Sequence, residues 1–194
     1  MMRTWTLAFT LCSLLIWSPI SQAGVFEIST TGSYRKTNFD ATNSTAMESL
    51  TGAIAYYFWE LSALQMSYTR GAASQVQPQY TAYQTFEAYG VDILITVANR
   101  ESILKPYIKA GVAYTAKDLR TFIPVPGSSP IIYNTLTVQS FGLSPTAGLG
   151  FKLMIGQQFA LKAGVDVSTS PLRKDSNEPT TYDFALNGGV SFMF

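Results

Sequence analysis

The sequence has 194 residues, of which 47% are hydrophobic and 13% charged, and its 13 basic and 12 acidic residues give a net charge of +1. This balance lacks the excess of basic residues that nucleic-acid binding requires, so we expect no nucleic-acid partner. The sequence contains no histidine, and its only cysteine is Cys12. These two facts limit both disulfide formation and nucleophilic catalysis.

The first 23 residues have the pattern of a targeting segment. Arg3 is the only charge ahead of an apolar run, Thr6–Trp17, and a small residue, Ala23, stands where a signal peptidase would cut. The run is too short to span a bilayer. We therefore predict a secretory signal peptide at residues 1–23, export by the general secretory route, and one mature domain at residues 24–194.

Apolar and polar residues alternate with a period of two over most of the mature chain, which is typical of strands with two different faces. Near residue 160, for example, Phe159 and Leu161 alternate with Ala160 and Lys162. Short turns between strands alternate with longer connections. The longer connections include the polar residues 37–47 and 70–83, which we expect to form loops. The predicted strands are residues 25–36, 48–58, 61–71, 84–97, 104–116, 137–154, 159–168 and 182–194.

This arrangement predicts an all-β fold, an eight-stranded antiparallel up-and-down transmembrane β-barrel. A soluble barrel of the lipocalin kind would turn its apolar face inward and cover its exterior with charge. Here the polar face is mostly Gly, Ala, Ser and Thr, which suits a narrow interior better. Aromatic residues also gather at both ends of the strands, as they do at membrane interfaces. Phe26, Phe58, Trp59, Phe159 and Phe194 mark the end with short turns, and Tyr34, Tyr68, Tyr89 and Tyr114 mark the other end.

Four segments resemble a known family. They are FEISTTGSYRKTN at 26–38, ALQMSYTRG at 63–71, LKPYIKAGVAY at 104–114 and GVSFMF at 189–194. In these segments the chain resembles the small outer-membrane β-barrels of Gram-negative bacteria, the OmpA/OmpX-type and related outer membrane protein beta-barrel domains. The resemblance implies integral insertion in the bacterial outer membrane, contact with its lipid and lipopolysaccharide, and delivery by the outer-membrane barrel assembly machinery. The motifs specify a barrel more than an activity.

We expect no enzymatic activity. Enzymes of comparable architecture in the families that this chain resembles rely on a histidine, and this sequence has none. The missing histidine excludes a Ser/His arrangement, and the missing cysteine in the mature chain excludes a cysteine nucleophile. Carboxylates such as Asp40, Glu48, Asp175 and Glu178 lack the spacing of a calcium loop. We therefore expect no metal site and no cofactor.

Strand parity directs a set of charged side chains into the barrel. One interpretation is a packed polar network in which buried charges are paired, because eight strands leave little lumen. The alternative is a gated ion path or proton relay lined by the same groups. The residues of this predicted interior network are Glu27, Arg35, Asp92, Lys109, Lys152, Lys162 and Asp166.

The third long connection, RTFIPVPGSSPIIYN at residues 120–134, is apolar and stiffened by prolines. One interpretation is a contact surface for another protein, a lipid or a host molecule, with Phe122, Ile131, Ile132 and Tyr133 as the candidate contact residues. Alternatively, this segment packs over the barrel mouth or continues the lipid-facing strands.

Two functions are consistent with these observations. The first is a non-enzymatic barrel with a packed polar interior that presents four extracellular loops for structural or surface-interaction roles. The second is a narrow channel or conduit for small or hydrophobic molecules. An apolar groove inside the barrel would distinguish the second function from the first.

The last strand carries an outward apolar face of Gly188, Val190, Phe192 and Phe194. We expect its last residue to lie at the periplasmic interface, where an aromatic ring is favoured, and the strand to pair with the first one. By resemblance, this ending is also the signal that the assembly machinery reads.

Overall fold

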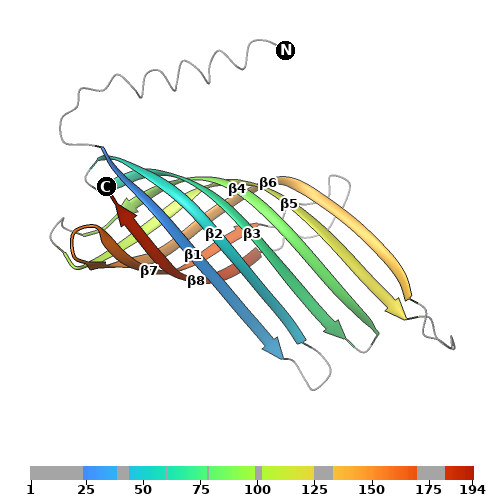
Figure 1. Cartoon of the computed structure of the whole chain (residues 1–194). Helices are drawn as coiled ribbons and strands as arrows, with labels where there is room; N and C mark the ends of the chain where they lie inside the picture. Colours follow the sequence, from blue (N-terminus) through green and yellow to red (C-terminus); the bar gives the residue numbers. More distant parts are fainter. Residues whose placement is uncertain are drawn as a thin grey trace, which may run out of the picture.

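A computed structural model describes residues 24–38, 44–59, 61–77, 79–98, 102–124, 133–169 and 182–194. The signal peptide predicted at residues 1–23 lies outside these ranges. The described residues form eight antiparallel strands that close into a barrel in sequence order (Figure 1), which confirms the predicted fold. The strands are β1 (Val25–Asn38), β2 (Ser44–Trp59), β3 (Ser62–Gln77), β4 (Tyr80–Thr96), β5 (Leu104–Pro124), β6 (Tyr133–Ile155), β7 (Phe159–Thr169) and β8 (Tyr182–Met193).

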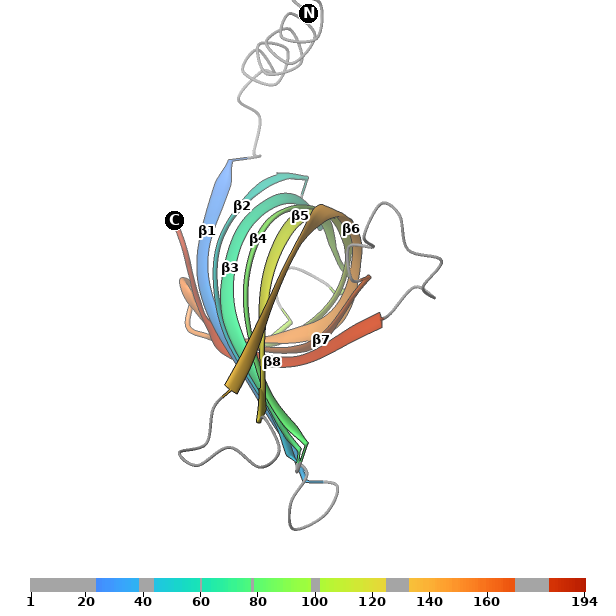
Figure 2. The same ribbon diagram turned by 90° about the vertical axis from the view of Figure 1, so that its right-hand side faces the viewer.

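The barrel closes where β1 meets β8. Their register runs from Glu27 opposite Met193 to Ser33 opposite Asn187. Beyond it, Phe194 exchanges two backbone hydrogen bonds with Phe26, at 2.9 and 3.0 Å. Figure 1 shows the start of β1 and the end of β8 at the same end of the barrel, and Figure 2 shows the strands curving around a common axis. The last strand is thus paired on both sides and leaves no edge there.

The two faces of each strand differ sharply in exposure. Outward residues such as Ile54 and Leu149 are 54% and 63% exposed, whereas inward residues such as Ser29 and Ala55 are 6% and 3% exposed. A surface covered by large apolar side chains is stable against lipid rather than water. The exterior is therefore that of a membrane-spanning barrel.

No helix among the described residues is long and apolar enough to cross a membrane.

Aromatic side chains on the exterior form rows near both ends of the strands. At the end with long connections, Tyr68, Tyr89 and Tyr114 lie opposite one another across β3, β4 and β5, and the first two rings are 5.1 Å apart. At the other end the Phe194 ring stacks against Phe26 at 6.0 Å. All nine aromatic residues expected at the two interfaces are exposed on the surface.

The strands are longer than the alternation predicted, and the second predicted loop is wrong. Residues 70–83 belong mostly to strands, because β3 reaches Gln77 and β4 begins at Tyr80. Similarly, β5 and β6 remain paired as far as Pro124 opposite Tyr133, which leaves residues 125–132 between them. Above the lipid an outward face need not be apolar, so strand pairing continues after the hydropathy pattern has ended.

Glycine makes room for the largest interior side chains. A Cβ atom at Gly150 would lie 2.5 Å from the Ala163 carbonyl oxygen and 2.7 Å from the Tyr107 hydroxyl oxygen. A Cβ at the outward Gly52 would meet nothing within 4 Å. The inward glycine is therefore required by packing, and the outward one is not.

We predict that Gly150→Ala lowers the free energy of unfolding by about 1–3 kcal/mol, because the methyl group overpacks the lumen. Gly52→Ala is the matched control, with an expected change within about 0.5 kcal/mol. Urea titration of both variants in detergent micelles measures the difference. Equal losses for the two variants would contradict this account of the packing.

Candidate functional site

The lumen holds a nearly fully buried ion cluster near the end where β1 begins. Glu27 of β1 accepts hydrogen bonds from Lys152 of β6 at 2.5 Å and from Lys162 of β7 at 3.1 Å. Lys162 also donates to the Ser29 hydroxyl at 3.3 Å. The Glu27 and Lys152 side chains are each 1% exposed. One carboxylate thus joins two ammonium groups from two other strands, β6 and β7.

Two tyrosines complete the cluster. The Tyr57 hydroxyl donates to Glu27 at 2.6 Å and accepts a hydrogen bond from Lys152. The Lys152 ammonium lies 5.6 Å from the centre of the Tyr107 ring, and the Lys162 ammonium lies 5.8 Å from it. At these distances the rings contribute cation–π attraction as well as volume.

Leucine and alanine side chains fill the space beside these rings. Leu94 is 1% exposed and packs with Ala55, Ala63 and Tyr107. The cluster and its apolar neighbour together fill this part of the lumen, and we call them the plug. The plug consists of Glu27, Tyr57, Leu94, Tyr107, Lys152 and Lys162.

A second polar layer lies next to the plug. Asp166 accepts hydrogen bonds from Lys109 at 2.8 Å and from the Asn187 amide at 2.9 Å. The buried Asp92 accepts a hydrogen bond from the Thr146 hydroxyl at 2.6 Å. This layer therefore carries two carboxylates and one ammonium group.

Lys117 donates to Asp183 at 2.7 Å, closer to the long connections. The predicted interior network included neither residue. Lys117 follows the predicted end of its strand, residue 116, by one position, so a longer predicted strand would have included it. Asp183 lies within the predicted strand 182–194 and has inward parity there, so parity alone was sufficient to place it inside.

Six of the seven charged residues predicted for the interior have inward side chains in the structure. Five of these six form ion pairs, each within one of the two layers. Arg35 lies in β1, but its side chain is outside the part that the structure describes. The bulk that closes the lumen comes from Tyr57, Leu94 and Tyr107, which the predicted network did not include. An inward position for each followed from parity, but the contact between them did not.

The predicted contact residues of the third connection are only partly described. Phe122 lies in β5, where its ring meets Tyr83 edge-on at 6.0 Å, and Tyr133 is the first residue of β6. These two residues are in strands and not in a loop, because pairing continues past the lipid. Ile131 and Ile132 lie outside the described residues.

The C-terminal residues that were predicted to face lipid lie on the exterior of β8 and at its end. Val190 and Phe194 are 54% and 59% exposed. The Phe192 ring lies between those of Phe159, at 4.9 Å, and Phe194, at 6.1 Å. Gly188 is also exposed.

Two cavities occupy the lumen on either side of the plug. The outer cavity, at the end with long connections, has a volume of about 330 Å³ and is lined mainly by Ser, Thr and Ala. The terminal cavity, at the end where β1 begins and β8 ends, has a volume of about 860 Å³. Among the described residues the two linings have no member in common, and Glu27, Leu94, Tyr107 and Lys162 belong to neither.

The described residues contain no group of three or more His, Cys, Asp or Glu side chains that could hold a metal ion.

Known proteins share this fold. No protein-family model and no curated protein matches the sequence. The chain is similar in structure to the N-terminal β-barrel domain of Pseudomonas aeruginosa OprF, at 20% identity over 88% of this chain and 99% of that chain, with a TM-score of 0.52. It is similar to Neisserial surface protein A, at 14% identity over 88% and 97%, with a TM-score of 0.57. It is also similar to Ail, the attachment invasion locus protein of Yersinia pestis, in complex with the heparin analogue sucrose octasulfate, at 11% identity over 89% and 100%, with a TM-score of 0.54. The chain therefore has the fold of eight-stranded outer-membrane barrels.

Proposed function

We propose that the protein is a non-enzymatic, integral barrel of the bacterial outer membrane that is closed to solutes and presents its outer end at the cell surface. The observation that carries closure is the plug. Glu27, Lys152 and Lys162 are buried and bonded to one another across the lumen, and Tyr107 fills the space beside them. A lumen blocked by paired charges and rings does not pass hydrated ions.

An outer-membrane location is supported by the surface and by the fold. The exterior is apolar along the strands and has aromatic rows at both ends, which suits contact with lipid and lipopolysaccharide. A cleaved signal peptide at residues 1–23 and export by the secretory route are part of the same proposal.

The absence of enzymatic activity is supported by composition. The sequence has no histidine to act as a base. The inward lysines form ion pairs with inward carboxylates, as Lys109 does with Asp166.

A protein or host-surface partner at the third connection is also part of the proposal. Its support is the apolar rim of the strands that lead to residues 125–132. Ile123, Tyr133 and Leu136 are exposed there, beyond the aromatic rows. Exposed apolar side chains above the lipid are suited to protein contact.

The ion cluster generates the first prediction for this function. Glu27→Gln should lower the free energy of unfolding by about 3–5 kcal/mol, because Lys152 and Lys162 stay buried without a carboxylate. The matched control is Glu87→Gln, since Glu87 is exposed and lies 3.8 Å from Arg70. We expect a loss of at most about 1 kcal/mol in that control. Urea unfolding in micelles measures both, and similar losses would show that the cluster is not a stabilising centre.

Closure generates the second prediction. The wild-type protein in planar lipid bilayers should show no steady conductance, whereas Tyr107→Ala should admit ions because it removes a ring from the plug. Tyr114→Ala removes an exposed ring of the same size and should leave the conductance unchanged. Leu94→Ala provides a second opening variant if Tyr107→Ala does not fold. Steady wild-type conductance comparable with that of a porin would refute closure.

The C-terminal residue generates the third prediction. Phe194→Ser keeps the two backbone hydrogen bonds with Phe26 but removes the ring. If the assembly machinery reads the terminal ring, the amount of protein inserted into the outer membrane of cells should fall several-fold. The free energy of unfolding in micelles should change little. Phe159→Ser, which removes another exposed ring at the same end, is the control. Equal insertion of Phe194→Ser and wild type would count against the assembly signal.

A further inference from the structure

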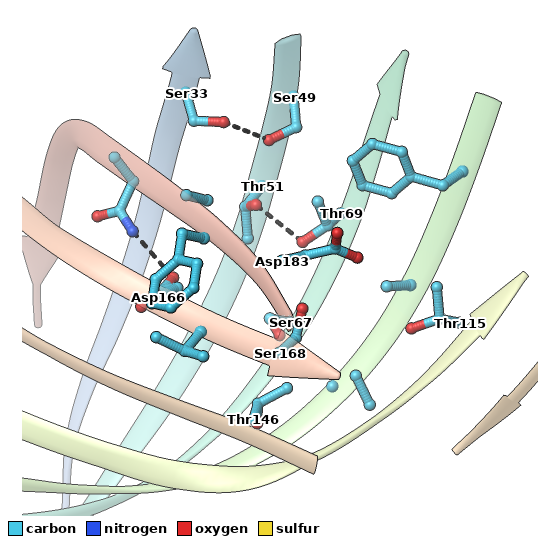
Figure 3. A pocket seen from close by; sticks show the side chains of 18 of the residues that line it. Ser33, Ser49, Thr51, Ser67, Thr69, Thr115, Thr146, Asp166, Ser168 and Asp183 are labelled. Atoms are coloured by element: carbon cyan, nitrogen blue, oxygen red, sulfur yellow. Dashed lines mark hydrogen bonds between the residues drawn. The ribbon is translucent and has the colours of Figure 1, made fainter. Parts of the chain in front are cut away.

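The outer cavity is lined by hydroxyl groups from most of the strands around it. Figure 3 shows Ser33, Ser49, Thr51 and Thr69 on neighbouring strands with their hydroxyls directed into one hollow. Other strands add further hydroxyl groups to the same cavity. These belong to Ser67 of β3, Thr115 of β5, Thr146 of β6, and Ser168 and Thr169 of β7. The cavity wall therefore presents many hydroxyl groups among apolar surface and is not dominated by charge.

These hydroxyls can form more hydrogen bonds than they form with one another. Ser33 and Ser49 are 2.7 Å apart, and Thr51 and Thr69 are 2.8 Å apart. A hydroxyl has one donor and two acceptor sites, so each pair uses one donor and one acceptor and leaves the rest available. The wall thus offers both donors and acceptors to a molecule in the cavity.

The charges on the wall are matched to each other. Its two ammonium groups, Lys109 and Lys117, lie 2.8 and 2.7 Å from the carboxylates of Asp166 and Asp183. The remaining carboxylate, Asp92, accepts the Thr146 hydroxyl. An anion would meet three carboxylates, and a cation at Asp166 or Asp183 would have to compete with the lysine that is bound there. A neutral molecule that donates hydroxyl hydrogens to carboxylates meets neither difficulty.

The cavity also has an apolar side and a suitable size. The Phe86 ring lines it, and its edge occupies the space that a Cβ at Gly71 would fill, with the Cζ atom 2.4 Å from that position. A ring held against the wall can pack on the C–H face of a sugar. The volume of about 330 Å³ is at the lower end of the range of about 300–1,000 Å³ for small-molecule sites.

We propose that the outer cavity is a binding site for a neutral, polyhydroxylated small molecule of the mono- or disaccharide class. The hydroxyls of Thr51 and Thr69 and the carboxylates of Asp166 and Asp183 bond the ligand hydroxyls, and Phe86 packs against its apolar face. The plug forms the floor, so the ligand enters and leaves by the outer end. Binding here goes beyond the closed-barrel function, since conductance tests the plug and saccharide binding tests the cavity.

The test is a titration of the full barrel with neutral sugars. The protein is purified in an amine-oxide detergent, because maltoside and glucoside detergents carry the chemistry of the probe. Saturation-transfer NMR with glucose, galactose, maltose and trehalose detects weak binding, and glucose 6-phosphate and glucosamine are the charged comparisons. We expect saturable binding of at least one neutral sugar, and weaker binding of both charged analogues.

Paired variants connect the binding to this cavity. Thr51→Val with Thr69→Val replaces both members of one hydroxyl pair by isosteric apolar groups, which leaves no buried polar partner unsatisfied and preserves folding. We expect sugar affinity to fall about tenfold in this double variant, because the ligand loses its hydrogen bonds. Phe86→Leu should weaken binding several-fold. Thr30→Val removes a hydroxyl from the exposed face of β1 and is the matched control with unchanged affinity.

Three results would overturn the proposal. The first is a folded wild-type barrel that binds none of the neutral sugars. The second is binding that neither the double threonine variant nor Phe86→Leu weakens. The third is tighter binding of glucose 6-phosphate or glucosamine than of glucose, which would show that charge and not hydroxyl chemistry governs the site.

Discussion

Backbone pairing in lipid is the constraint on which the rest of the structure depends. An unpaired amide or carbonyl group costs several kcal/mol in hydrocarbon, so each strand needs a partner on both sides within the lipid. This requirement brings β1 to β8 and joins Phe26 to Phe194 through their backbones. Closing only eight strands leaves an interior that side chains nearly fill. Inward charged groups then depend on other groups in the lumen for their partners.

The ion layers follow from that enclosure. The plug has one carboxylate and two ammonium groups, and the next layer has Asp92 and Asp166 with a single ammonium group. The first layer thus has an excess positive charge and the second an excess negative charge, so neighbouring layers attract each other. Glycine makes room for the ion pair of the second layer, because a Cβ at Gly148 would lie 2.3 Å from Asp166 Oδ1 and 2.7 Å from Lys109 Cε. The opposite charges of the two layers therefore compensate each other, in addition to the pairing of charges within each layer.

Sequence parity predicts which face a residue takes, because side chains alternate strictly along a strand. It places Glu27, Lys152 and Lys162 inside without knowledge of any contact. It does not predict that they meet, since 125 residues separate Glu27 from Lys152 and their relative height depends on strand stagger. The ends of strands are also poorly predicted. Outside the lipid the outward face can be polar, and Lys117 consequently fell beyond the predicted strand while it still faces inward.

The size of the inward side chains determines where the lumen has a cavity. Strand parity predicts which residues point inward, but not how much of the lumen they fill. At the plug the inward positions carry Lys, Tyr and Leu, whose long or bulky side chains reach across a barrel of eight strands. Toward the outer end the inward positions of β1, β2 and β3 carry Ser and Thr, which leave a cavity between the walls. The same alternation therefore produces a filled lumen near the end where β1 begins and a cavity toward the outer end. The plug lies between this cavity and the terminal cavity, and the two linings share no residue among those that the structure describes.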